Sequence, residues 1–192
     1  MRLIICNFGP MNSFYTLFFL FAFALNTVAQ APAKINWMSW NEALAANNDE
    51  PRLIFVDTYT DWCGWCKKMD ASTFANPVIA EYMNEHYYAV KMDAEMKDTI
   101  EFNGYTFVNP QPDRKRSTHQ LAASLLDNKL SYPSFIFLNA EFQRIQILPG
   151  YKAPKQFEPI MRYFVEGASQ GVQYEDYMSN FVSLFPAPEQ AN

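Results

Sequence analysis

The sequence predicts an α/β fold in which a mixed central sheet carries helices on both faces. Short apolar runs rich in strand-forming residues alternate along the chain with segments that have apolar residues at helical spacing. The expected order is helix, strand, helix, strand, an insert with a helix, two strands and a helix, which is typical of a sheet covered on both sides. With 192 residues, 49% of them hydrophobic, one domain with one sizeable core is expected.

The first half of this pattern has three helical segments and two strands. A helix over residues 39–48 begins at the possible cap Ser39, and an apolar run at 53–56 predicts a strand covered on both faces. The next helix begins at the cysteines that follow this strand. Asn76 and Pro77 are typical of a helix cap and first helical position, and residues 87–93 predict a second strand.

The second half begins with an irregular insert, residues 94–131. Its Asn-Gly pair between alternating apolar residues predicts a hairpin, and a helix capped by Ser117 or Thr118 should follow, with its inner face formed by Leu121, Leu125 and Leu126. Residues 133–139 and 144–150 are close enough to form an antiparallel pair of strands. A final amphipathic helix should run from Pro154 to near Gly167, followed by a short aromatic segment within an extension over 168–192.

The first 31 residues are typical of a secretory signal peptide. Arg2 is the only charge, residues 14–25 are apolar or nearly so, and the small residues at 29–31 suit cleavage. Twelve apolar residues fall short of the roughly twenty that span a bilayer, which disfavours an uncleaved anchor. We therefore expect export, to the periplasm or beyond, of a mature domain over 32–192 with no stable membrane span; Met11 is an alternative start.

The charge of the chain argues against nucleic acid as a partner. A net charge of -5 gives no overall positive field to hold a phosphate backbone. The basic cluster at 113–117 is interpreted as a solvated loop.

Signal cleavage would remove Cys6 and leave Cys63 and Cys66, three positions apart. A disulfide across two intervening residues closes too small a loop to stabilise the fold much. A zinc site needs about four ligands, and beyond carboxylates the chain offers only His86 and His119, each in an expected helix. Lys67 stands where covalent haem attachment would need a histidine. The pattern therefore favours redox chemistry over a structural crosslink or a metal site, and it needs no cofactor.

Four features together resemble the thioredoxin superfamily, and more narrowly the exported thioredoxin-like domains of thiol-disulfide interchange proteins. Asp57 lies six residues before the first cysteine, "DWCGWCK" matches the active-site motif, "SYPSFIFL" matches the segment with the cis-proline, and Gly150 matches a glycine that closes the last strand. The similarity covers about residues 37–167. It implies a three-layer α/β/α fold, with the hairpin and helix of residues 94–131 inserted before the strand that follows the cis-proline.

The resemblance also implies roles for individual residues. Cys63, at a helix N-terminus, is expected to be the nucleophile, activated by the dipole and by backbone N–H groups that include that of Cys66. Cys66 should be more buried and should resolve the mixed disulfide. Asp57, if buried, would have a raised pKa and take a proton from Cys66. The expected substrate-binding residues are Trp62, Gly64, Trp65, Tyr132 and a cis Pro133.

Two departures from the family pattern bear on function. Trp65 replaces the proline that reductants of the family usually have between the cysteines, which leaves the redox potential open, and the insert adds surface. The predicted function is an exported thiol-disulfide oxidoreductase that acts on protein thiols and disulfides, as a reductant or electron carrier supplied by an upstream redox partner. The alternative is a non-catalytic binding module whose cysteines rest as a closed disulfide, and a buried Cys63 would favour it.

Overall fold

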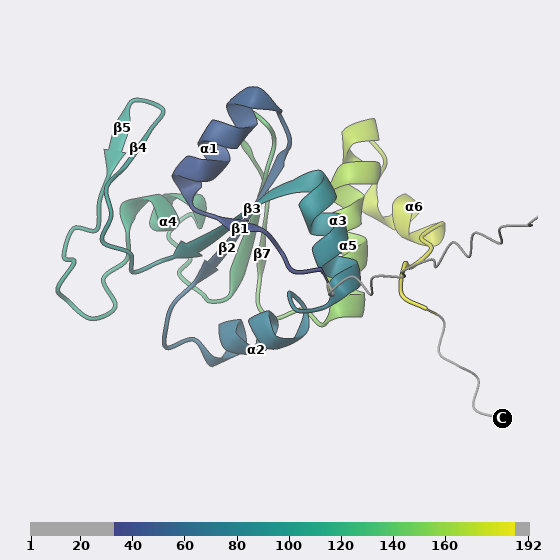
Figure 1. Ribbon diagram of the computed structural model, residues 1–192, viewed down its shortest axis with the longest axis horizontal. Coiled ribbons are helices and arrows are strands. Elements are labelled where there is room, and N and C mark those ends of the chain that lie inside the picture. Colours follow the sequence, from purple (N-terminus) through teal and green to yellow (C-terminus); the bar gives the residue numbers. More distant parts are fainter. Residues whose placement is uncertain (1–32, 187–192) are drawn as a thin grey trace, which may run out of the picture. The chain divides into compact units, whose positions relative to one another are not determined.

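The computed structural model describes residues 33–186, and the expected signal peptide lies outside this range. A five-stranded sheet forms the centre, in the order β1-β3-β2-β6-β7 (Figure 1). Its strands are β1 (Trp37–Met38), β2 (Leu53–Tyr59), β3 (Tyr87–Asp93), β6 (Ser134–Leu138) and β7 (Arg144–Pro149). β2 pairs in parallel with β3 and antiparallel with β6, so the sheet is mixed, as predicted.

Helices cover both faces of the sheet (Figure 1). On one face, α2 (Gly64–Ser72), α3 (Pro77–His86) and α5 (Pro154–Glu166) pack on a core that includes Phe55, Phe135 and Phe137. On the other, α1 (Trp40–Asp49) and α4 (Gln120–Leu125) pack on residues of alternate strand positions, among them Val56 and Ile136. Successive strand residues point to opposite faces, so β2 buries both of its sides. The predicted three-layer α/β/α fold is confirmed.

Most of the local predictions are confirmed. Ser39 caps α1 through a capping box with Glu42, and Asn76 caps α3 with Pro77 in its first turn. The hairpin of β4 (Ile100–Phe102) and β5 (Tyr105–Phe107) turns at Asn103 and Gly104, which both have positive φ as a two-residue hairpin turn requires. In Figure 1 the hairpin extends from the end of the domain where α4 lies.

One local prediction is wrong, and one strand was missed. The cap of α4 is His119, not Ser117 or Thr118: its ring Nδ1 accepts from the Leu121 N–H at 3.2 Å, and its Nε2 faces the Asp98 carbonyl oxygen at 3.0 Å. The Ser117 hydroxyl instead donates to the Asn109 side chain. His119 is therefore a buried capping residue before the helix. Strand β1 was not predicted, because two residues are too few to show strand periodicity.

Beyond α5, the chain continues through the short 3-10 helix η1 (Ala168–Gln170) and α6 (Tyr174–Ser179). Residues 181–184 then return to α5, where the Ser183 hydroxyl and the Leu184 N–H donate to the buried carboxylate of Glu158. Within residues 33–186, no helix is both long and apolar enough to cross a bilayer.

Candidate active site around the Cys63–Cys66 disulfide

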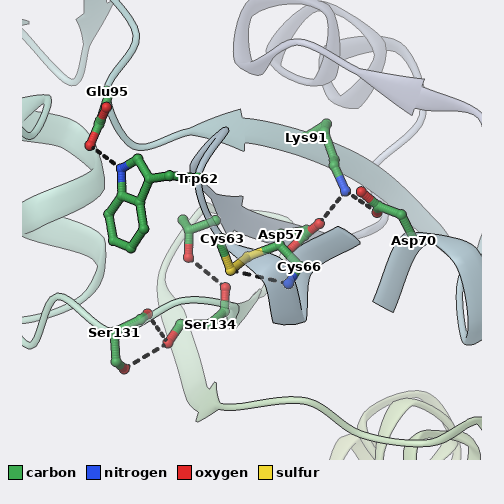
Figure 2. The surroundings of a disulfide bond; sticks show 10 residues. Asp57, Trp62, Cys63, Cys66, Asp70, Lys91, Glu95, Ser131 and Ser134 are labelled. Carbon is green, nitrogen blue, oxygen red and sulfur yellow. Dashed lines mark hydrogen bonds and ion pairs between the residues drawn. A yellow bond between two sulfur atoms is a disulfide. The ribbon is translucent and has the colours of Figure 1, made fainter. Parts of the chain in front are cut away.

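The two cysteines form a disulfide at the point where β2 passes into α2, with Cα atoms 5.3 Å apart (Figure 2). Cys63 is the N-cap of α2, and its Sγ accepts a hydrogen bond from the Cys66 N–H at 3.1 Å. This is the backbone donor expected from the sequence. The free N–H groups and the dipole of a helix N-terminus both favour negative charge, so the position suits a thiolate.

Both cysteines are buried in this oxidised form. Cys66 is 2% exposed and Cys63 5% exposed, so Cys66 is the more buried of the two, as predicted, by a small margin. Burial of Cys63 is the feature that the sequence analysis assigned to the non-catalytic alternative. Because the S–S bond itself covers part of each sulfur, access to the reduced Cys63 thiol stays a prediction.

Asp57, near the end of β2, is 1% exposed, which agrees with its predicted burial. Burial raises the pKa of its carboxyl from the ordinary 3.8 to about 6, and the nearby Lys91 opposes the rise. Lys91 Nζ lies 2.6 Å from Asp57 Oδ2, and the two residues are register partners in the parallel β2–β3 pair. Asp57 Oδ1 has no hydrogen-bond partner in the part of the chain that the structure describes. The carboxyl is therefore incompletely satisfied.

Sequence reasoning missed the role of Lys91. Burial disfavours its charge, but Asp57 and Asp70, both in contact with its ammonium, outweigh this and raise its pKa (Figure 2). Its side chain also lies over the Trp37 and Phe74 rings. The signal was a lysine inside an otherwise apolar strand, but only the strand register shows that it faces Asp57.

The two tryptophans beside the cysteines are exposed, Trp62 by 51% and Trp65 by 56%. The Trp62 indole N–H donates to Glu95 at 2.7 Å (Figure 2). The Arg116 guanidinium lies 4.9 Å from the centroid of the Trp62 ring. Both partners come from the insert of residues 94–131. The insert therefore contacts a residue next to Cys63, a connection that the sequence analysis did not foresee.

The Tyr132–Pro133 peptide bond is cis, as the resemblance implies. A groove of about 320 Å³ lies beside it, and its lining includes three residues predicted to bind substrate: Trp65, Tyr132 and Pro133. Gly150 and Tyr151 complete the lining. Trp62 stands outside it, with its ring 6.0 Å from that of Tyr132, and Gly64 has open space where a side chain would be. Sequence analysis did not identify Tyr151.

No group of three or more His, Cys, Asp or Glu residues that could hold a metal ion occurs between residues 33 and 186. Burial lowers the pKa of His119, whose two ring nitrogens are both engaged by the backbone.

Two known proteins similar to this chain are named for disulfide chemistry. A protein of Chlamydia pneumoniae named "Disulfide bond reductase DsbH" is 25% identical over 116 residues, 60% of this chain and 63% of that protein. The "Thiol:disulfide interchange protein DsbD" of Salmonella typhi is 33% identical over 63 residues, 30% of this chain and 11% of that protein. The chain thus spans less than two thirds of the length of either relative.

Solved structures agree with the fold. A structure titled "DsbH Oxidoreductase" matches with a TM-score of 0.52 and 17% identity over 74% of this chain and 94% of that one. A thioredoxin from Thermus thermophilus matches with a TM-score of 0.52 and 18% identity, over 73% and 94% of the two chains. The family model Thioredox_DsbH, described as "Protein of unknown function, DUF255", matches residues 25–145. The chain therefore belongs to the Thioredox_DsbH family, a thioredoxin-superfamily family of the thiol-disulfide interchange type.

Proposed function

We propose that the protein is an exported thiol-disulfide oxidoreductase that reduces protein disulfides, or carries electrons onward, through Cys63 and Cys66. The observation that supports it most is a disulfide at the N-terminus of α2, with Cys63 Sγ accepting the Cys66 N–H, in a member of this family. The direction toward reduction is supported by the relative named a disulfide bond reductase. Export rests on the signal-like pattern of residues 1–31.

In the first step, the Cys63 thiolate attacks one sulfur of a client disulfide. The client S–S bond breaks, a mixed disulfide forms, and the second client sulfur leaves as a thiolate. The helix dipole contributes about 0.3–1 kcal/mol to ionising Cys63. This is less than the roughly 1.36 kcal/mol of one pKa unit, so the hydrogen bond from Cys66 N–H must add to it.

In the second step, Cys66 gives its proton to the Asp57 carboxylate and attacks Cys63 Sγ. The mixed disulfide breaks, the Cys63–Cys66 disulfide forms, and the client leaves with two thiols. The client has gained two electrons and two protons: one proton comes from Asp57, which took it from Cys66, and one from water, which balances the proton that Cys63 lost on ionising. A pKa of about 6 suits Asp57 to accept and release a proton near neutral pH. An upstream redox partner must then return two electrons to the protein.

The client would lie along the groove beside Pro133. Trp65 and Tyr132 would contact its apolar side chains, Trp62 would form the opposite rim, and the open space at Gly64 would let the client backbone approach.

Reduction of insulin by the mature chain tests the proposal. The protein, with a dithiol reductant, should turn insulin over, Cys63→Ser should abolish turnover, and Cys66→Ser should accumulate the mixed disulfide. Turnover no faster than that of Cys63→Ser would contradict an oxidoreductase role. The potential of the couple, measured against glutathione, decides the direction, because about 30 mV corresponds to 1.4 kcal/mol.

Cys63 is 5% exposed in the disulfide form, but the S–S bond itself covers part of its sulfur, so this burial does not favour the alternative of a non-catalytic binding module. After reduction, a catalytic Cys63 should react with iodoacetamide faster than a cysteine in an unfolded peptide. A rate equal to or below that of the peptide would support the binding module.

A further inference from the structure

The groove beside Pro133 combines an apolar lining with nearby positive charge. Trp65, Tyr132, Pro133 and Tyr151 supply the apolar and aromatic surface. Such a lining explains contact with apolar side chains, but not the two lysines at the same end of the molecule.

Lys68, on α2, places its ammonium over the ring of Trp65, 4.8 Å from the centroid, and 5.1 Å from that of Tyr151. The charge therefore lies against two lining residues of the groove. The side chain itself is exposed, and among residues 33–186 no carboxylate lies within 4.0 Å of its nitrogen.

Lys152, which follows β7, brings a second ammonium to the same place. Its Nζ donates to the carbonyl oxygens of Pro149, at 2.9 Å, and Gly150, at 3.3 Å. These contacts fix the charge beside Gly150, which lines the groove. An ammonium has three donors, so one stays free for a ligand. Within the described range this lysine also has no carboxylate partner.

Two other lysines, by contrast, do have acidic partners. Lys91 contacts Asp57 and Asp70, and Lys97 pairs with Asp113. Lys68 and Lys152 thus hold positive charge beside the groove without acidic partners, in a chain whose net charge is -5. Opposite charge is the complement that such a surface selects.

We infer that the groove selects client segments in which an aspartate or glutamate lies close to the reactive cysteine. The apolar part of the segment packs on Trp65 and Tyr151, and the client carboxylate pairs with Lys68 and Lys152. This inference rests on the proposed function for its client but concerns recognition alone, so binding can be measured without turnover.

Binding of labelled peptides to the oxidised protein, followed by fluorescence anisotropy at low salt, tests the inference. Two peptides share one apolar sequence in which alanine replaces the cysteine, and they differ only in glutamate or lysine at the flanking positions. Exposed ion pairs contribute little individually, so two of them predict that the glutamate peptide binds more tightly by a factor of about ten to thirty. The preference should shrink at 1 M salt.

The double variant Lys68→Glu, Lys152→Glu should reverse the preference. Lys34→Glu makes the same kind of charge change at another exposed lysine and should leave the preference in place. Equal affinity of the wild-type protein for both peptides would overturn the inference. So would a loss of preference in Lys34→Glu as large as the loss in Lys68→Glu or in Lys152→Glu.

Turnover of the small uncharged substrate hydroxyethyl disulfide separates the two proposals. Normal turnover of hydroxyethyl disulfide together with equal binding of the two peptides rejects the inference of acidic selection and leaves the reductase proposal in place. A clear peptide preference with no turnover of any disulfide keeps acidic selection and rejects the reductase.

Discussion

Two regions of the molecule each bury a carboxylate, but the two carboxylates differ in how many hydrogen-bond donors contact them. Asp57, beside the disulfide, and Glu158, on α5, are both 1% exposed. Glu158 accepts from the Ser183 hydroxyl and the Leu184 N–H, each at 2.5 Å, and from Arg162 at 3.4 Å. Asp57 has Lys91 at one oxygen, and no partner at the other within the described residues.

The difference separates a structural carboxylate from one suited to chemistry. Buried polar atoms in proteins almost always have partners, and those that lack them need an explanation. At Glu158 the donors hold residues 181–184 against α5, so its charge joins two segments of the chain. At Asp57 the shortage of donors lets burial raise the pKa to about 6, where the carboxyl can exchange a proton near neutral pH.

The largest effect is expected from Glu158→Ala. Removing one member of a buried ion pair costs about 3–5 kcal/mol of the free energy of unfolding, and here two further donors lose their acceptor. Arg162 keeps Glu166, which places the expected loss near the lower end. Urea unfolding of the oxidised protein measures it.

Glu158→Gln is the matched control, because it keeps the hydrogen-bonding shape of the side chain and removes its charge. It should cost less than Glu158→Ala, and neither change should alter iodoacetamide labelling of reduced Cys63. An Ala variant as stable as the wild type would show that residues 181–184 do not depend on Glu158.

The next largest effect is expected from Asp57→Asn. This change should alter how the free energy of unfolding depends on pH, by about 3 kcal/mol relative to the wild type. A pKa raised from 3.8 to about 6 means that the folded protein holds a proton that the unfolded chain has lost between these pH values. The wild type therefore loses about 3 kcal/mol of its free energy of unfolding as the pH rises through this window, because each pKa unit corresponds to about 1.36 kcal/mol. The asparagine variant has no such titration, so it should gain about 3 kcal/mol relative to the wild type between pH 3 and pH 8.

Urea unfolding at several pH values measures this difference. Asp70→Asn removes a carboxylate from the same lysine at a side chain that is 44% exposed, and serves as the control. Parallel stability curves of the wild type and Asp57→Asn would show that burial does not disfavour the charge of Asp57.

The two carboxylates also differ in how far the sequence predicts them. Asp57 follows an uninterrupted apolar run, so its burial can be read from local periodicity. The burial of Glu158 depends on Ser183 and Leu184, some 25 positions away, which no local pattern brings to α5. Residues on short, regular elements were predictable for the same reason: the caps Ser39 and Asn76, and the hairpin turn, depend only on their immediate neighbours.

Predictions failed where a residue depends on distant partners. The sequence around the α4 cap offers Ser117 and Thr118, but the Asp98 carbonyl engages the His119 ring and Asn109 engages the Ser117 hydroxyl. Around the disulfide, the cysteines could be identified from their spacing, and Asp57 from the resemblance to the thioredoxin superfamily. Lys91 could not, because its partner lies 34 positions away.

The smallest effect is expected from Lys91→Met, which should change the pKa of Asp57. Lys91 opposes the rise in the pKa of Asp57, both through its charge and through a direct hydrogen bond. Lys91→Met keeps an unbranched apolar side chain at this position and removes the ammonium, which lies over the Trp37 and Phe74 rings. The pKa of Asp57 should then rise further, by at least about one unit, equivalent to about 1.4 kcal/mol.

A carbon-13 NMR titration of the Asp57 carboxyl measures this directly, because the carboxyl carbon shifts on protonation. Lys97→Met removes the ammonium of an exposed surface pair and should leave the titration unchanged. An Asp57 midpoint that stays in place or falls in Lys91→Met would mean that donors other than Lys91 hold the charge. Asp57 would then resemble Glu158, a carboxylate satisfied by its surroundings, and its suitability for proton transfer would lose its physical basis.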